Sequence, residues 1–154
     1  MKNRVSVMKN ICRLLVLCLL LSVFTASAET SAEVSDLIRQ AQAALEASDY
    51  ETAVPLLQAA ADAGNDQAQL WLGNCYDAGA GVEQNAEEAV RYYRLAADQG
   101  FPVALFAVGD CCYLGTGVEK DPEAAREWYQ KSLNAGYEPD EEDQKHMADV
   151  MGKE

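Results

Sequence analysis

The sequence predicts an all-α fold, an α-solenoid built from stacked antiparallel helix pairs. Matching residues recur at a constant offset of 36 positions, and such self-similarity is the signature of repeat architectures. Within each repeat, apolar residues follow the three- and four-residue spacing of one helix face. Glycines stand between these segments, where helices commonly end.

The first residues have the layout of a secretory signal peptide, which we expect over 1–28. A basic start is followed by an apolar run of 11 residues, over 14–24, and by Ala26-Ser27-Ala28. Small residues at this point favour cleavage after Ala28, which would leave a mature domain over 29–154. The alternative is an uncleaved membrane anchor, but the apolar run is short of the roughly 20 residues that span a bilayer. The start at Met1 or Met8 is left open.

The first predicted unit covers about residues 33–64. Only Ser48 and Asp49 join its two helices, so it has no room for the glycine loop of the later units. Pro55 lies within its second helix and removes one backbone hydrogen bond, which predicts a bend there.

The second unit, about 65–100, and the third, about 101–136, match each other closely. These pairs are 36 residues apart: Ala68 and Ala104, Gly73 and Gly109, Cys75 and Cys111, Gly79 and Gly115, Gly81 and Gly117, Tyr93 and Tyr129. In each unit we expect a helix, a glycine turn and a second helix, as over 66–78 and 86–98.

Capping residues predict where the second helices begin and end. Asn85 is a favourable N-cap, with Glu88 three residues on as its capping-box partner. In the third unit Asp121 is the N-cap and Pro122 takes the first helical position. Glycines 64, 100 and 136 stand where a left-handed residue ends a helix. After Gly136 we expect one last acidic helix, about 138–150, as an end cap.

The G-x-G-V turn at Gly79–Val82 raises a second interpretation, a loop that cradles a phosphate. Phosphate loops of the dinucleotide and P-loop kinds follow a strand and need a further glycine or a lysine. This turn follows a helix instead, and carboxylates such as Asp77 and Glu83 lie nearby. We therefore expect a turn between helices and no cofactor.

The pattern of the second and third units resembles the Sel-1-like repeat, a relative of the tetratricopeptide repeat. It reads A-x-x-x-L-G-x-x-Y-x-x-G-x-G-V, a capped helix start, then A-x-x-x-Y-x-x-A-A-x-x-G, and it matches residues 68–100 and 104–136. The third unit departs from it at Val108, Cys112 and Ser132-Leu133, all small or apolar. The first unit looks more like a plain tetratricopeptide repeat.

The resemblance implies a scaffold that binds other proteins, because the first helix of each unit in such arrays lines the concave surface. Carried over position by position, it implies a groove lined by Gln67, Leu70, Asn74, Asp77, Val103, Phe106, Asp110 and Tyr113. Ala78 and Leu114 extend these stripes, and the continued period adds Glu142, His146 and Asp149. Leu70, Phe106 and Tyr113 are not required by the packing pattern and have carboxylates beside them. The alternative is that these residues are ordinary protein surface.

Three cysteines follow the predicted signal peptide. Cys75 and Cys111 hold equivalent core-facing positions, where a free thiol acts as a small hydrophobe. Cys112 lies one step around the helix, and a Cys75–Cys112 disulfide is the alternative to buried thiols. No C-x-x-C pair is present, and we expect no metal site.

The charge of the mature domain restricts its partners. Its eight basic residues face 25 acidic ones, a formal charge of −17. Such a surface repels phosphate backbones and anionic lipid heads. We expect a protein or peptide partner that carries an apolar anchor and Lys or Arg, without nucleic acid or stable membrane insertion.

The favoured interpretation is thus a secreted or periplasmic adaptor without catalytic residues. The alternative from a different class is an exported hydrolase or cell-wall-linked enzyme, for which Cys111, Cys112 and the single histidine, His146, are the available reactive groups. A third hypothesis is an array that works only as part of a larger assembly.

Overall fold

The structure, a computed structural model, describes residues 31–152. The predicted signal peptide over 1–28 lies outside the described residues. The chain divides after Asp36 into two compact units. Of the first unit, residues 31–36 are described, and they are helical. The second unit, from Leu37, holds all the features below.

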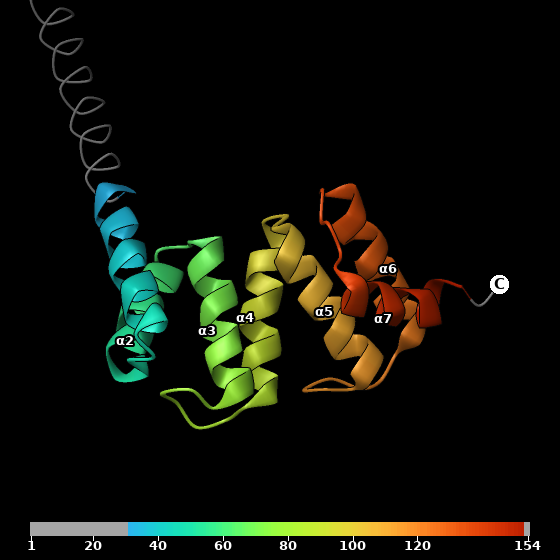
Figure 1. Cartoon of the computed structure of the whole chain (residues 1–154), viewed down its shortest axis with the longest axis horizontal. Coiled ribbons are helices and arrows are strands. Elements are labelled where there is room, and N and C mark those ends of the chain that lie inside the picture. The colour runs from blue at the N-terminus through green and yellow to red at the C-terminus, as the bar shows by residue number, and fades with distance from the viewer. Residues whose placement is uncertain (1–30, 153–154) are drawn as a thin grey trace, which may run out of the picture. The chain divides into compact units, whose positions relative to one another are not determined.

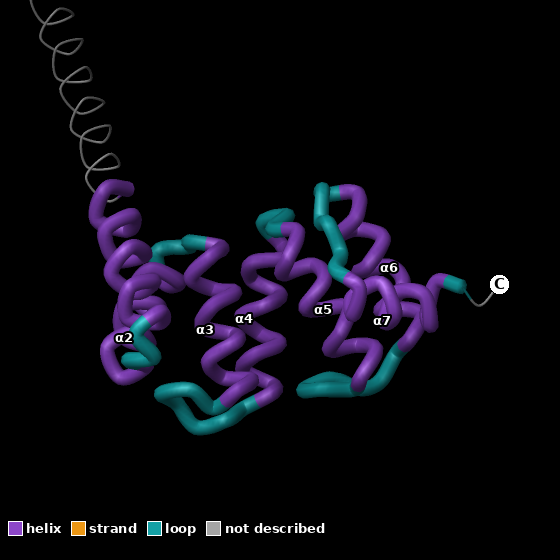
Figure 2. Tube along the Cα trace, in the orientation of Figure 1, coloured by secondary structure: helices purple, strands orange, loops and turns teal. Residues whose placement is uncertain are grey.

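Helices account for most of the described chain, and residues 31–152 contain no strand (Figure 2). Residues 31–46 are helical, and six helices follow: α2 Tyr50–Asp62, α3 Asp66–Ala78, α4 Ala86–Asp98, α5 Pro102–Leu114, α6 Pro122–Asn134 and α7 Glu141–Met151. Within the second unit, α2 to α6 stand side by side in chain order (Figure 1). The predicted antiparallel helix pairs are confirmed. None of the described helices has the length and apolar character needed to cross a membrane.

The predicted caps place the second helix of each later unit. The side chain of Asn85 accepts from the Glu88 amide at 3.1 Å, and that of Asp121 accepts from the Ala124 amide at 3.0 Å. The expected capping box at Glu88 is wrong, because its carboxylate pairs with the Arg91 guanidinium at 2.9 Å instead of reaching back. Glycines 64, 100 and 136 follow helix ends with φ of 87°, 82° and 94°, as predicted.

Pro55 lies inside α2 without ending it. The helix runs unbroken from Tyr50 to Asp62. The side chain of Asp49 accepts from the Thr52 amide at 3.2 Å and caps its start. The lost hydrogen bond at Pro55 is therefore tolerated within a helix whose buried face is packed.

Each later helix pair is tied together by a buried tyrosine. The Tyr93 hydroxyl donates to Asn74 at 2.9 Å, and 36 residues later the Tyr129 hydroxyl donates to Asp110 at 2.6 Å. Tyr129 is fully buried. Because a buried hydroxyl without a partner is costly, these bonds fix how the second helix lies on the first.

The G-x-G turn is an element of packing between units. A β-carbon on Gly117 would lie 2.2 Å from the Ala86 carbonyl oxygen, at the start of α4 in the preceding unit. One unit earlier, a β-carbon on Gly81 would lie 2.7 Å from the β-carbon of Tyr50, at the start of α2. Gly117 also has a φ of 67°, which favours glycine. The second glycine thus lets each turn pack against the unit before it.

The last helix, α7, takes the place of a first helix in a fourth unit. The Tyr113 hydroxyl donates to the Asp149 carboxylate at 2.5 Å, and His146 Nδ1 lies 3.4 Å from Asp110 Oδ1. In both contacts the partners are 36 residues apart. An acidic last helix was predicted over about 138–150, and it forms over Glu141–Met151.

Candidate functional site

The predicted groove residues divide into two groups on α3 and α5. Asn74, Asp77 and Val103 are exposed, whereas Gln67, Asp110 and Tyr113 are half-buried. Leu70 and Phe106 are buried, with 7% and 6% of their surface exposed. The expectation that these two residues stand outside the packing is therefore wrong.

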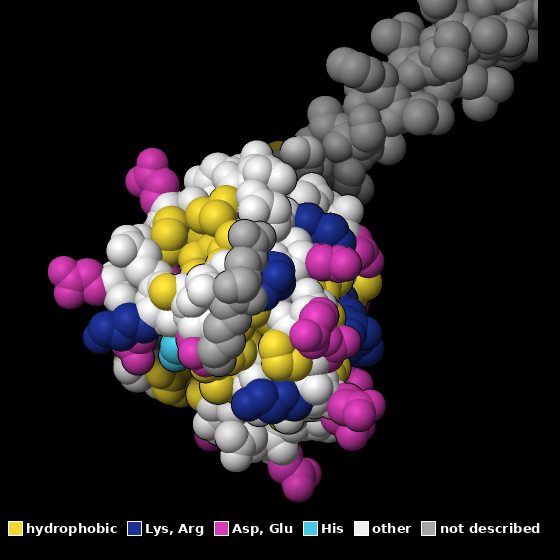
Figure 3. Space-filling view, turned by 90° about the vertical axis from the view of Figure 1, so that its right-hand side faces the viewer, with side chains coloured by type: hydrophobic (Ala, Val, Ile, Leu, Met, Phe, Trp, Pro, Cys, Tyr) yellow, Lys and Arg dark blue, Asp and Glu magenta, His cyan; other side chains and the backbone are white. Residues whose placement is uncertain are grey.

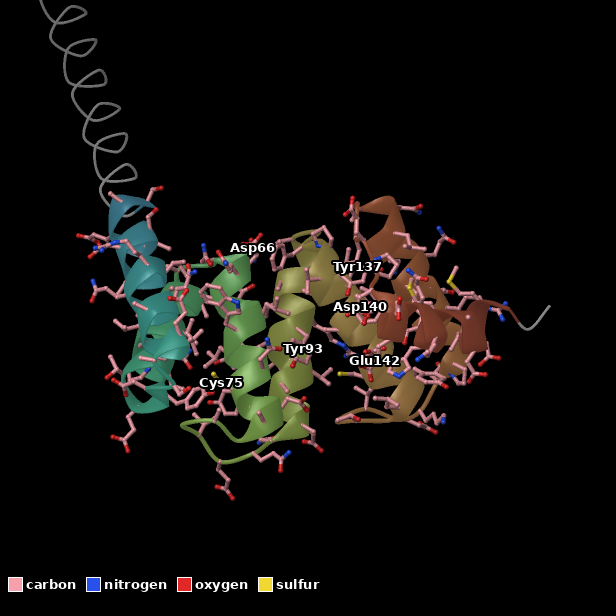
Figure 4. The ribbon with its side chains drawn as sticks, viewed as in Figure 1. Asp66, Cys75, Tyr93, Tyr137, Asp140 and Glu142 are labelled. Carbon is pink, nitrogen blue, oxygen red and sulfur yellow. The ribbon has the colours of Figure 1, made fainter. Side chains whose placement is uncertain are left out.

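The position of Phe106 on its helix explains its burial. Phe106 precedes Ala107, so its side chain points about 100° away from that of Ala107 around the helix. There its ring stacks with Tyr129, at 5.3 Å between ring centres, and with Tyr137, at 4.7 Å. Figure 4 labels Tyr137 on the segment that leads into α7. Phe106 thus packs against α6 and the approach to α7, and Leu70 belongs to the same buried cluster.

Three polar side chains meet beneath α7. Asp110 accepts from the Tyr129 hydroxyl and lies beside His146, whose Nδ1 is buried and has no hydrogen-bond partner among the described residues. Burial raises the pKa of the Asp110 carboxyl above its usual value, although the Tyr129 hydrogen bond and His146 oppose the shift. The predicted groove residue Asp110 is therefore largely engaged within the chain.

A second contact attaches the other end of α7 to α5. The Tyr113 hydroxyl donates to Asp149, and the Tyr113 ring lies 5.7 Å from the His146 ring. The guanidinium of Arg126 donates to the Val150 carbonyl at 2.7 Å, near the end of α7. Of the positions added by the continued period, His146 and Asp149 thus contact α5, and Glu142 is exposed. Together these contacts close the C-terminal part of the predicted groove.

An accessible face remains along the first helices, which we call the first-helix face. It has two stripes at the same helical spacing: Gln67, Trp71, Asn74 and Ala78 on α3, and Val103, Ala107, Asp110 and Leu114 on α5. Val103 and Leu114 are among the most exposed large apolar residues described, at 41% and 56%. Trp71 is half-buried and was missed by the sequence reasoning. Trp71 follows Gln67 by four residues and precedes Asn74 by three, and this helical spacing could have placed it on the same face.

All three cysteines of the described chain are free thiols, and all are buried. The Cys75–Cys112 disulfide that the sequence left open is not formed. Cys75 lies on α3, as Figure 4 shows. Desolvation by burial raises the pKa of each thiol, that of Cys111 to about 12. Within residues 31–152, no three His, Cys, Asp or Glu side chains are grouped to hold a metal ion.

The C-terminal end of the part from Leu37 onward is charged at its rim. Figure 3 faces this end and shows Asp and Glu side chains, with Lys and Arg among them, around apolar ones. The segment that opens α7 carries Glu141, Glu142 and Asp143 in its first turn, after the Asp140 cap. Carboxylates are favourable near a helix N-terminus, so this cluster has a local structural cause.

Comparison with protein families finds the Sel1 repeat three times along the chain. The matched segments are residues 42–65, 66–101 and 102–137. The first unit, which looked more like a plain tetratricopeptide repeat, thus also matches the Sel1 repeat despite its shorter turn. No curated protein is similar enough to this chain to count as a match.

Solved structures of three bacterial proteins share this fold. The chain is 41% identical to a protective antigen of uropathogenic Escherichia coli with an SLR fold, over 57% of this chain and 19% of the other, with a TM-score of 0.56. It is 38% identical to a Sel1 repeat protein from Oxalobacter formigenes, over 57% and 25% of the two chains, with a TM-score of 0.56.

The third solved structure is similar in fold alone. Cysteine-rich protein B of Helicobacter pylori is 19% identical over 78% of this chain and 93% of the other, with a TM-score of 0.56. The similarity to the first two thus spans a quarter or less of their lengths. Since the family's repeats match from residue 42 to residue 137, the chain belongs to the Sel1 repeat family.

Proposed function

We propose that this protein is an exported scaffold that binds a partner polypeptide on its first-helix face. Sel1-repeat proteins are generally scaffolds for protein–protein interaction. The observation that carries the proposal is that Val103 and Leu114, 41% and 56% exposed, stand on the same stripe of α5 and are available as apolar anchors for a partner.

The chemistry of the face defines the partner. Half-buried Asp110 belongs to the stripe on α5, exposed Asp77 lies beside the stripe on α3, and the mature domain is strongly acidic. A partner with an apolar anchor and neighbouring Lys or Arg side chains would complement both properties. Export to the periplasm or the medium is proposed from the signal peptide predicted over 1–28.

The test is capture of partners by the full mature chain and by a surface variant. The double variant Val103→Ser, Leu114→Ser removes two anchors, and Leu95→Ser is the matched control, because Leu95 is 40% exposed on α4, a second helix. We expect the double variant to lose most of the protein captured from the envelope and medium of the producing cells. Leu95→Ser should retain it, and circular dichroism should show all variants equally helical.

Equal capture by both variants and the unaltered chain would place the binding surface elsewhere. Salt gives a second criterion, because a contribution from carboxylates should weaken as ionic strength rises. Binding that is unaffected between low and high salt would contradict the cationic partner.

The alternative of an exported hydrolase has little support from the described residues. The thiols of Cys111 and Cys112 are buried with raised pKa values, the reverse of what an activated nucleophile needs. His146 lies beside the Asp110 carboxylate and the Tyr113 ring, and neither is a nucleophile that a histidine base would activate for hydrolysis. We therefore propose a binding function without catalysis.

A further inference from the structure

Within the part from Leu37 onward, the junction between the repeats at about 33–64 and 65–100 contains a stack of two tyrosines. The rings of Tyr76 on α3 and Tyr92 on α4 lie 5.6 Å apart and are within 10° of parallel. The Arg91 guanidinium lies over the Tyr92 ring, 4.0 Å from its centre, and the Tyr92 hydroxyl donates to Gln58 on α2 at 3.0 Å. The first junction is thus filled by its own side chains.

The next junction, 36 residues along, has lost one member of this stack. Cys112 stands in the place of Tyr76, Trp128 in the place of Tyr92 and Arg94 in the place of Gln58. A cation again lies over the remaining ring, since Lys131 Nζ is 4.2 Å from the centre of the Trp128 ring. Among residues 31–152, no aromatic ring stacks on Trp128 as Tyr76 does on Tyr92.

An open cleft of about 530 Å³ occupies this junction. Its lining residues come from α4, α5, α6 and the turn before α6: Arg94, Cys112, Val118, Glu119, Lys120, Asp121, Ala124 and Trp128. A cysteine side chain is far smaller than a tyrosine ring, and the unpaired indole then contributes an apolar, polarisable wall. The guanidinium of Arg94 supplies hydrogen-bond donors at the same cleft.

We propose that this cleft receives a tyrosine side chain from the partner polypeptide, in the place that Tyr76 fills at the preceding junction. The incoming ring stacks on Trp128, and its hydroxyl oxygen accepts from Arg94. The inference rests on the proposed scaffold function and adds a specificity subsite to it. It also gives Cys112 a role, because a small side chain there leaves room for the ring.

The occupant is identified by the internal comparison within this chain. At the first junction an aromatic ring stacks with Tyr92, the ring that corresponds to Trp128, and a cation also lies over Tyr92. An aliphatic side chain would fill part of the volume but would lose the ring stacking, worth about 0.5–1.5 kcal/mol in aromatic pairs. A tyrosine is therefore preferred over a leucine.

The test uses N-acetyl-L-tyrosinamide as the probe, followed by two-dimensional NMR of the mature chain. We expect shifts of the Trp128 indole N–H and of the backbone amides of residues 94, 112 and 118–121, with a millimolar dissociation constant, about 1–10 mM for one side chain. N-acetyl-L-leucinamide at equal concentration should shift these signals at least threefold less.

Two substitutions decide whether the probe occupies this cleft. Cys112→Tyr restores the residue found at position 76, fills the cleft from within, and should abolish the shifts. Cys112→Ser keeps the space and should retain them. Trp128→Leu removes the stacking wall, should also abolish binding, and decides the question if Cys112→Tyr does not fold.

Three results would overturn the inference. They are equal shifts with the leucine probe, no shifts up to about 50 mM of the tyrosine probe, about fivefold above the upper end of the expected range, and shifts that persist in folded Cys112→Tyr or in Trp128→Leu. Partner capture distinguishes this failure from that of the scaffold. If Cys112→Tyr captures partners fully and Val103→Ser, Leu114→Ser does not, the first-helix face stands and the tyrosine subsite is wrong.

Discussion

Gly109 lies directly beneath the ring of Tyr129. A β-carbon on Gly109 would stand 2.7 Å from the ring atoms Cδ1 and Cε1. The same relationship joins Gly73 to Tyr93, at 2.5 Å from Cε1. Gly73 lies five residues before the end of its helix, and in the first repeat the residue five positions before the end of the first helix, at 46, is Ala41. The residue 36 positions before Tyr93 is Leu57. Ala41 and Leu57 are both fully buried. The smaller residue on one helix thus accompanies the larger ring on the other.

Gly109→Ala should therefore lower the free energy of unfolding by about 1–3 kcal/mol, the cost of overpacking a close contact. Urea denaturation measures it. The double variant Gly109→Ala, Tyr129→Leu reproduces the Ala41 and Leu57 combination. Its loss of stability should be about 1 kcal/mol smaller than the sum of the losses measured for the two single variants. Gly64→Ala measures a different cost, that of a left-handed backbone alone, because nothing lies within 4 Å of its β-carbon position but its φ is 87°. Strict additivity at Gly109 would refute the steric explanation.

Phe106→Ala should destabilise the fold by about 3–4 kcal/mol, because the ring is buried between those of Tyr129 and Tyr137. The measurement is again urea denaturation, with Val103→Ala as the control, since Val103 is exposed and lies on the same helix. That control should stay within about 0.5 kcal/mol of the unaltered chain. A loss below about 1 kcal/mol for Phe106→Ala would show that the ring stack contributes little.

Tyr113→Phe removes the hydroxyl that donates to Asp149 and should loosen α7. Amide hydrogen exchange followed by mass spectrometry should show faster exchange over Glu141–Met151, with α3 and α4 unchanged. Tyr50→Phe is the matched control, because Tyr50 is exposed and its hydroxyl has no partner among the described residues. Identical exchange of α7 in both variants would contradict a restraining role for this hydrogen bond.

Asp110→Asn should stabilise the protein at pH 7. Burial raises the pKa of this carboxyl in the folded state, so the ionised form carries a penalty above the folded pKa. The penalty disappears as the pH falls through the folded pKa to the unfolded value, where both states are protonated. Asn74 shows that an amide oxygen accepts the equivalent tyrosine hydrogen bond.

The expected gain for Asp110→Asn is about 0.5 kcal/mol, since the group is only partly buried and water screens it. That is about 2 °C in Tm for a domain of this size. Thermal unfolding between about pH 4 and pH 7 should show the stability advantage of Asp110→Asn shrinking toward the lower pH. The lower limit lies at about the pKa of an Asp side chain in the unfolded state. His146, Tyr129 and Asp143 also face this carboxyl and are common to both proteins. A variant less stable than the unaltered chain at pH 7 would reverse this assignment.

The thiols should react slowly with N-ethylmaleimide in the native protein. Cys75, Cys111 and Cys112 are 3%, 8% and 5% exposed, and burial raises their pKa values. Because the thiolate is the reacting species, we expect labelling at pH 7 to be at least tenfold faster in denaturant than in buffer. Mass spectrometry of tryptic peptides assigns each site. Rapid labelling of Cys111 in buffer would contradict its burial.

The sequence by itself determined the helices, their ends and the repeat. Asn85, Asp121 and the glycines at 64, 100 and 136 act through bonds to their own neighbours, so their effect is readable from local order. The offset of 36 residues identified the units for the same reason. Even so, Glu88 was assigned to a capping box although its carboxylate pairs with Arg91, because both arrangements satisfy the local spacing.

Only the tertiary structure decided which residues of the first helices are accessible. Phe106 and Leu70 lie on their helices between the buried side and the first-helix face. Helical spacing alone does not reveal which neighbouring residues cover such intermediate positions. The close fit of α7 on Asp110 and Tyr113 depends on contacts across 36 residues. The open cleft beside Trp128 is likewise lined by residues of α4, α5, α6 and the turn before α6 together, which no local pattern reveals.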